Sequence, residues 1–199
     1  MIQRIGVIYQ DVYSRGFLEG LKLRLACHAE LVPTQGNVGR SKHMKRRNAR
    51  NACLFLLGKN VDVIIRFTDA DGADWQDVKR RELDVFPASV REILVIGVAL
   101  NNPEEWLALT PDYLAAKLGI DARALRNDPD KSSVIKCAID VQCRTPDGLS
   151  DVAGFVARLL ADAPSPVFRM WLREDSFKRF YQECRGIASR FECDTRNEL

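Results

Sequence analysis

Two aspartates, Asp69 and Asp71, follow the apolar run 61–67 within the segment 68–72. The run is rich in β-branched residues and predicts a buried strand. Residues two apart in an extended chain point to the same side, so both carboxylates are expected to meet at the carboxyl end of this strand. Mg²⁺ prefers oxygen ligands, and one or two carboxylates with water and phosphate suffice. The pattern predicts a divalent-cation site. The alternative is an acidic turn that only leads out of the strand.

Two glutamates, Glu104 and Glu105, follow the apolar run 93–100, which predicts another strand covered on both faces. They belong to the same predicted sheet edge, where one of them could supply a further metal ligand. Asn102 and Pro103 precede them and form a good helix start, and acidic side chains favour the positive end of a helix. Helix initiation is therefore the competing interpretation of both glutamates.

A third polar turn follows the short run 5–9, which also predicts a strand. Asp11 in this turn would face Asp69 and Asp71 if the first and third strands were neighbours, and it could act as a ligand or base. The alternative is that Asp11 or Ser14 caps the following helix.

The elements that must position these acids alternate along the first hundred residues. Strands are predicted at 5–9, 31–33, 61–67 and 93–100, with helices after Ser14, over 43–57 and over 75–83. Right-handed crossovers then give an α/β fold with an open, mainly parallel, four-stranded sheet flanked by helices. Ligands of such sheets collect at the carboxyl ends of the strands.

The second half of the chain is predicted to be helical. Helix starts occur at Asn102-Pro103 and Thr110-Pro111, and helical spacing covers 130–140, 149–162 and 175–188. We therefore expect an α/β core over 1–101 and a helical extension over 102–199, packed on or beside the core, with both parts able to form a single domain.

A basic run at 40–50 contains no acid and is the candidate surface for phosphate groups. Three of its arginines share one face of a helix. The competing interpretation is a solvated helix face, because the net charge of the chain is only +3. The cationic residues of the run are Arg40, Lys42, Lys45, Arg46, Arg47 and Arg50.

Composition excludes several classes of protein. No apolar run approaches the roughly 20 residues of a membrane span, and the first ten residues read as a strand rather than a signal peptide. We expect a cytoplasmic protein with no membrane partner. The six cysteines form no Cys-x-x-Cys and only two histidines are present, so a zinc site is not expected and the thiols should be free. Neither a dinucleotide-binding glycine motif nor a serine-hydrolase elbow occurs.

Together, the strand order, the polar turn after the first strand and the acidic pair after the third resemble the Toprim domain family of topoisomerases, primases and OLD-type nucleases. The likeness extends to small standalone Toprim-like proteins. It includes the segment 102–107 and Asp130-Lys131, and continues at Trp171-Leu172 and over 176–180.

This resemblance implies metal-dependent phosphodiester chemistry, with Mg²⁺ or Mn²⁺ as cofactor. It implies a nuclease or nuclease subunit that acts on DNA or RNA, working beside a separate ATPase chain, for example in phage defence. Nucleic acid, this ATPase and a second copy of the chain are the partners it suggests. The implied metal ligands are Asp69 and Asp71, with Glu104 or Glu105 in support and Asp11 as a further candidate.

One position departs from the family, which usually places a glutamate after the first strand as ligand or acid/base. Gln10 occupies the best-matching position, and glutamine cannot ionise. Three explanations are open: Asp11 or Glu19 takes the role, the natural protein is catalytically weak, or the chain is an engineered Glu-to-Gln variant. The competing function is a catalytically silent Toprim-like module that binds nucleic acid or regulates a partner. A small phosphotransfer enzyme on a similar sheet is a third.

Overall fold

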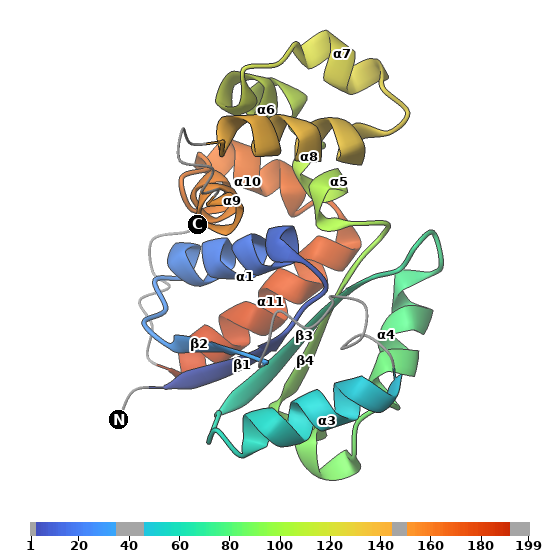
Figure 1. Ribbon diagram of the computed structural model, residues 1–199, viewed down its shortest axis with the longest axis vertical. Coiled ribbons are helices and arrows are strands. Elements are labelled where there is room, and N and C mark those ends of the chain that lie inside the picture. The colour runs from blue at the N-terminus through green and yellow to red at the C-terminus, as the bar shows by residue number, and fades with distance from the viewer. Residues whose placement is uncertain (1–2, 35–45, 145–150, 192–199) are drawn as a thin grey trace.

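Four strands form a single sheet in the order β2-β1-β3-β4. The computed structural model describes residues 3–34, 46–144 and 151–191 (Figure 1). Each neighbouring pair of strands is parallel, with Ile5 opposite both Leu31 and Val63. The predicted parallel α/β sheet is therefore confirmed. Its strands are β1 (Arg4–Ile8), β2 (Glu30–Pro33), β3 (Val63–Asp69) and β4 (Leu94–Ala99).

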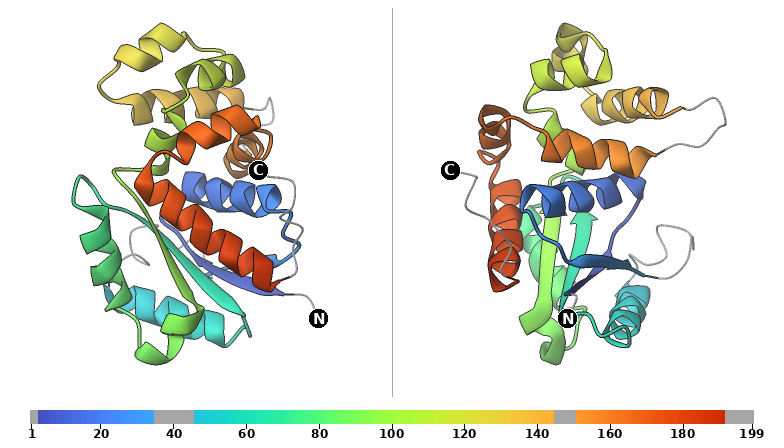
Figure 2. Two further views of the ribbon diagram at one scale, coloured as in Figure 1. Left: turned by 180° about the vertical axis from the view of Figure 1, so that it is seen from behind. Right: turned by 90° about the vertical axis from the view of Figure 1, so that its left-hand side faces the viewer.

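Helices cover both faces of the sheet because successive residues of each strand point to opposite sides. On β3, Ile65 and Phe67 pack into a core with α1 (Val12–Arg24) and α11 (Asp175–Arg190). Ile64 on the other face packs with α3 (Arg46–Leu57) and α4 (Trp75–Leu83). Figure 2 shows α11 lying across one face and α3 on the opposite side.

Glycine on β4 allows α11 to approach the sheet closely. A Cβ atom at Gly97 would lie 2.7 Å from ring atoms of both Phe180 and Phe67. These two rings contact each other with centroids 5.3 Å apart and planes tilted by 31°. The C-terminal aromatic residues therefore pack in the core.

A second close contact joins α1 to α9 (Val152–Ala161). A Cβ atom at Gly16 would lie 2.5 Å from the carbonyl oxygen of Ala153, and one at Gly20 would lie 2.8 Å from that of Ala157. Small residues one turn apart on both helices let the two backbones meet. The helical second half thus shares the core of the sheet through α9 and α11.

The remaining helices complete the second half and the β3–β4 connection. They are η1 (Ala88–Ile93, a 3₁₀ helix), α5 (Pro103–Leu107), α6 (Pro111–Leu118), α7 (Ala122–Asn127), α8 (Lys131–Gln142) and α10 (Ser165–Trp171). The sequence missed α7 and α10, which are short and lack an extended periodic pattern. Of the helices in the described ranges, none is long and apolar enough to cross a membrane.

The cysteines of the described ranges are free thiols, as predicted. Cys27, Cys53, Cys143 and Cys184 are buried and Cys137 is exposed. Cys53 is among the most buried residues of the core on α3, which agrees with its apolar sequence context.

Candidate active site at the carboxyl edge of the sheet

Three acidic side chains meet where β1, β3 and β4 end. Asp11 follows β1, Asp69 ends β3, and Glu104 lies in the helix that follows β4. The strand order puts β3 between β1 and β4, so all three chain ends reach the same edge. We call Asp11, Asp69 and Glu104 the acidic cluster.

Asp69 is the half-buried last residue of β3 and pairs with Ala99 of β4. Its Oδ1 atom is buried and accepts no hydrogen bond from the described residues. Burial, reinforced by the charges of Glu104, Asp11 and Asp71, raises the pKa of Asp69 to about 7. A carboxylate here requires a cation or a proton for compensation.

Glu104 is almost completely buried, with 2 % of its surface exposed. Asn102 caps α5 by accepting a hydrogen bond from the Glu105 backbone N–H at 3.2 Å, so the predicted helix start is real. That start directs Glu104 into the interior, where its Oε2 atom accepts no hydrogen bond from the described chain. Burial raises the pKa of Glu104 to about 7, although Lys136 opposes the shift.

Asp11 has two roles at once. Its Oδ1 atom accepts hydrogen bonds from the backbone N–H and the hydroxyl of Ser14, both at 2.8 Å, and so caps α1. Its Oδ2 atom lies 3.8 Å from Nζ of Lys136. The two sequence interpretations of Asp11 are therefore compatible, since capping uses only one of its oxygens.

Lys136 on α8 is a basic residue of this site that no motif of the sequence indicated. Its Nζ atom lies 3.6 Å from Oε2 of Glu104 and 5.2 Å from the ring centroid of Tyr13. The Tyr13 hydroxyl donates a hydrogen bond of 2.6 Å to Asp140, one turn after Lys136 on α8. Tyr13 thereby links α1 to α8 beside the acidic cluster. The sequence predicted a helix over 130–140, which includes Lys136 and Asp140. It did not predict that this helix contacts the acidic residues at the edge of the sheet.

Asp71 and Glu105 lie outside the buried cluster. The predicted alternation of Asp69 and Asp71 fails because β3 ends at Asp69 and Asp71 adopts a left-handed φ of 49° in the following turn. Asp71 is exposed, yet its charge still contributes to the raised pKa of Asp69. Glu105 accepts hydrogen bonds of 2.8 Å from Asn101 at both carboxylate oxygens. Of the two glutamates, Glu104 is the one that joins Asp69.

Gln10 is half-buried at the bend between β1 and α1, immediately before Asp11. It therefore lies at the same edge as the acidic cluster.

The basic run 40–50 lies only partly within the described residues. Arg40, Lys42 and Lys45 lie outside the described residues, Arg46 and Arg47 belong to the first turn of α3, and Arg50 is exposed on that helix.

The acidic cluster partly meets the needs of a divalent cation. Among residues 3–34, 46–144 and 151–191, no group of three or more His, Cys, Asp or Glu side chains is arranged to hold a metal ion. Two buried oxygens without hydrogen-bond donors are nevertheless present, Oδ1 of Asp69 and Oε2 of Glu104. One or two carboxylates suffice for Mg²⁺, which usually keeps several waters. Asp69 and Glu104 fit this minimal set.

A polar pocket of about 430 Å³ is lined partly by α5, the helix that carries Glu104, and by α8, the helix that carries Lys136. Asn102 and Glu105 line it from the α5 side, and Lys131 and Ser132 line it from the start of α8. Lys131 and Ser132 precede Lys136 by about one turn of the same helix. The pocket offers room for a polar ligand, but none of the three acidic-cluster residues lines it, and Asp128 and Asp130 add carboxylates to its wall.

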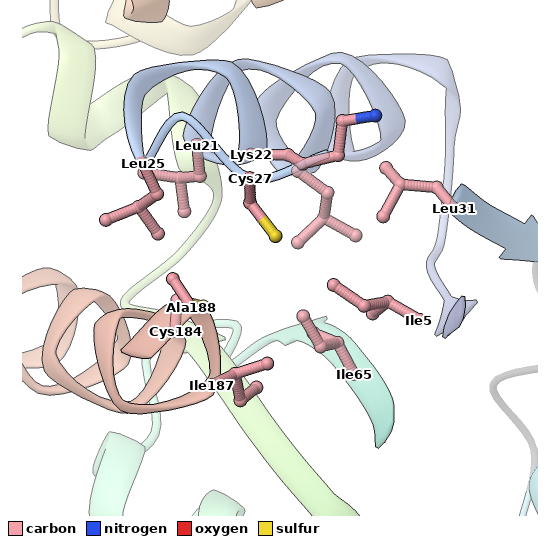
Figure 3. Close-up of a pocket in the computed structure, with 11 residues that line it drawn as sticks. Ile5, Leu21, Lys22, Leu25, Cys27, Leu31, Ile65, Cys184, Ile187 and Ala188 are labelled. Atoms are coloured by element: carbon pink, nitrogen blue, oxygen red, sulfur yellow. The ribbon is translucent and has the colours of Figure 1, made fainter. Parts of the chain in front are cut away.

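A second cavity, of about 30 Å³, has a different character. Figure 3 shows it between α1 and α11, with Ile5, Leu25 and Cys27 among the side chains around it. Ile5 lies near the amino end of β1, so this cavity belongs to the opposite edge of the sheet. Its lining is almost entirely apolar, and we regard it as a packing defect of the core.

The comparisons with known proteins add no family to this description. No protein-family model, curated protein or solved structure matches the chain.

Proposed function

We propose that this protein is an Mg²⁺- or Mn²⁺-dependent enzyme that hydrolyses phosphodiester bonds in DNA or RNA, acting as a nuclease or as the nuclease subunit of an assembly with a separate ATPase. One observation carries the proposal. Asp69 and Glu104, from two neighbouring strand ends, bury carboxylate oxygens that accept no hydrogen bond from the described residues, and Lys136 reaches only Glu104 of the two within ion-pair distance, at 3.6 Å. Charged oxygens of this kind are costly unless a cation compensates them. The resemblance of the sequence to the Toprim family supports the same chemistry.

In this proposal, Asp69 and Glu104 hold the metal and the polar pocket lined by α5 and α8 receives the substrate. A bound divalent ion would activate a water and stabilise the leaving oxygen of a phosphodiester. Lys131 and Ser132 can contact phosphate or sugar oxygens from the pocket wall. Asp71, exposed in the turn after β3, can bind a metal-coordinated water at the rim of the cluster.

A catalytically silent nucleic-acid-binding module is the second candidate, and Lys136 favours it. Its ammonium already neutralises part of the charge of Asp11 and Glu104. Gln10, beside Asp11, supplies no ionisable group. A site compensated by its own lysine can persist without metal.

Cleavage of labelled single- and double-stranded DNA and RNA with Mn²⁺ distinguishes the two candidates. We expect cleavage by the Gln10→Glu variant to exceed that of the parent chain, because glutamate restores an acid/base or ligand. The additional change Asp69→Asn should abolish it. Retained nucleic-acid binding with no cleavage by any variant, at Mn²⁺ concentrations shown to bind, would reject the enzyme and support the silent module.

A further inference from the structure

Lys136 supplies a positive charge to the acidic cluster. Its Nζ atom lies within 4 Å of two carboxylates that come from different elements, at 3.8 Å from Asp11 and 3.6 Å from Glu104. Its positive charge also lowers the pKa of Asp69, against the opposing effect of burial. A single ammonium thus interacts with all three members of the cluster.

The packing of α8 fixes the backbone of Lys136 but leaves its ammonium group free to move. The hydrogen bond between Tyr13 and Asp140 holds α8 against α1, and the Tyr13 ring lies 5.2 Å from the ammonium. The Lys136 side chain is nevertheless 33 % exposed, while that of Glu104 is 2 % exposed. A flexible lysine stem can carry its ammonium outward without any movement of α8.

We propose that Lys136 is the resident counter-cation of the metal-free site, and that a divalent ion binds by displacing its ammonium toward solvent. The inference rests on the proposed metal dependence and adds how that dependence is controlled. A lysine ammonium and a divalent ion repel one another strongly at such distances. Both therefore compete for the same carboxylates. Lys136 stabilises the empty site and weakens metal binding, so that metal occupancy requires a high ion concentration or a substrate that takes up the displaced ammonium.

Mn²⁺ titration calorimetry and thermal unfolding of the whole chain test this exchange in the parent protein, Lys136→Met and Lys136→Arg. Methionine keeps much of the length and removes the charge, while arginine keeps the charge. We expect Lys136→Met to lower the melting temperature in EDTA and to tighten Mn²⁺ binding at least tenfold, since a tenfold change corresponds to about 1.4 kcal/mol. Mn²⁺ should restore the lost stability. Lys136→Arg should behave like the parent. Lys178→Met, an exposed change on α11, is the matched control and should alter neither quantity.

Weaker or unchanged Mn²⁺ binding by Lys136→Met, with metal bound by the parent chain, would overturn the exchange while leaving the proposed function intact. An absence of Mn²⁺ binding by every variant would overturn both. A measurement on the parent chain covers the case in which the variant fails to fold. Acylation of Lys136 by an amine-selective reagent, followed by mass spectrometry relative to Lys178, should become faster when Mn²⁺ binds. A rate that stays constant or falls contradicts displacement.

Discussion

Replacing Asp69 by asparagine should stabilise the metal-free protein at pH 8 and should not stabilise it at pH 4. The pKa of this carboxyl is raised from 3.8 to about 7 in the folded chain, chiefly by burial. A group whose folded pKa is raised contributes its full stability below pH 3.8. That contribution is then lost as pH increases through about 7. Above pH 7 the folded protein carries a buried charge that asparagine removes.

The magnitude follows from the shift. The difference between about 7 and 3.8 is close to three pKa units, and each unit is worth about 1.36 kcal/mol, so the upper bound is about 4 kcal/mol. Oδ1 of Asp69 accepts no hydrogen bond from a described donor, so the amide that replaces the carboxyl loses about 1–3 kcal/mol of this through incomplete hydrogen bonding. We expect a net stabilisation of about 1–3 kcal/mol at pH 8. For a chain of this size, this corresponds to an increase in melting temperature of roughly 2–12 °C.

Thermal and urea unfolding in EDTA at pH 4 and pH 8 measure this difference. Asp71→Asn is the matched control: Asp71 is exposed and has a left-handed φ of 49°, which asparagine tolerates. Its stability should stay within about 0.5 kcal/mol of the parent at both pH values. The reasoning would be refuted by an Asp69→Asn variant that is no more stable than the parent at pH 8, or that is equally stabilised at both pH values. Either result would show that the ionised Asp69 carboxylate does not destabilise the folded protein.

Three further predictions concern the site, the packing and the thiols. Glu104→Gln should weaken Mn²⁺ binding in calorimetry by roughly tenfold or more. Its control, Glu105→Gln, should change Mn²⁺ binding by less than about threefold. Equal effects of the two changes would contradict the assignment of Glu104 as the metal ligand. Gly16→Ala should destabilise the protein by about 1–3 kcal/mol in urea, because its Cβ would lie 2.5 Å from the Ala153 carbonyl oxygen. Gly186→Ala on α11, with open space around the new Cβ, should instead stabilise it by roughly 0.5–1 kcal/mol. Of the described cysteines, Cys137 alone is exposed and should react with an aromatic disulfide reagent in the native state, and fast reaction of the buried thiols would contradict the core described above.

The strands and their parallel arrangement were predictable because they depend on short-range patterns. Continuous apolar runs such as 93–100 are typical of strands covered on both faces, and β4 is buried in this way. The start of α5 was predictable for a similar reason, since Asn102 and Pro103 act on their immediate neighbours. The carboxyl-edge location of Asp11, Asp69 and Glu104 followed from strand order and chain direction.

Asp69 and Asp71 were expected to point to the same side of an extended chain, and a local turn prevents this. Alternation requires an extended chain, and the chain turns immediately after Asp69. Which glutamate turns inward was also undecided by sequence, because Glu104 and Glu105 both suit the first turn of a helix. The register of α5 against the sheet buries Glu104 and leaves Glu105 to Asn101.

The sequence by itself determined the α/β architecture and the edge at which its acids gather, because apolar periodicity, helix caps and chain direction are properties of neighbouring residues. Only the tertiary structure decided which residue compensates the negative charge of those acids. Lys136 is 125 positions from Asp11 and 32 from Glu104 in the numbering, and α8 reaches them through helix packing in the second half of the chain. The cost of burying charge depends on such long-range neighbours, so the raised pKa values and the lysine contacts arise only in the folded protein.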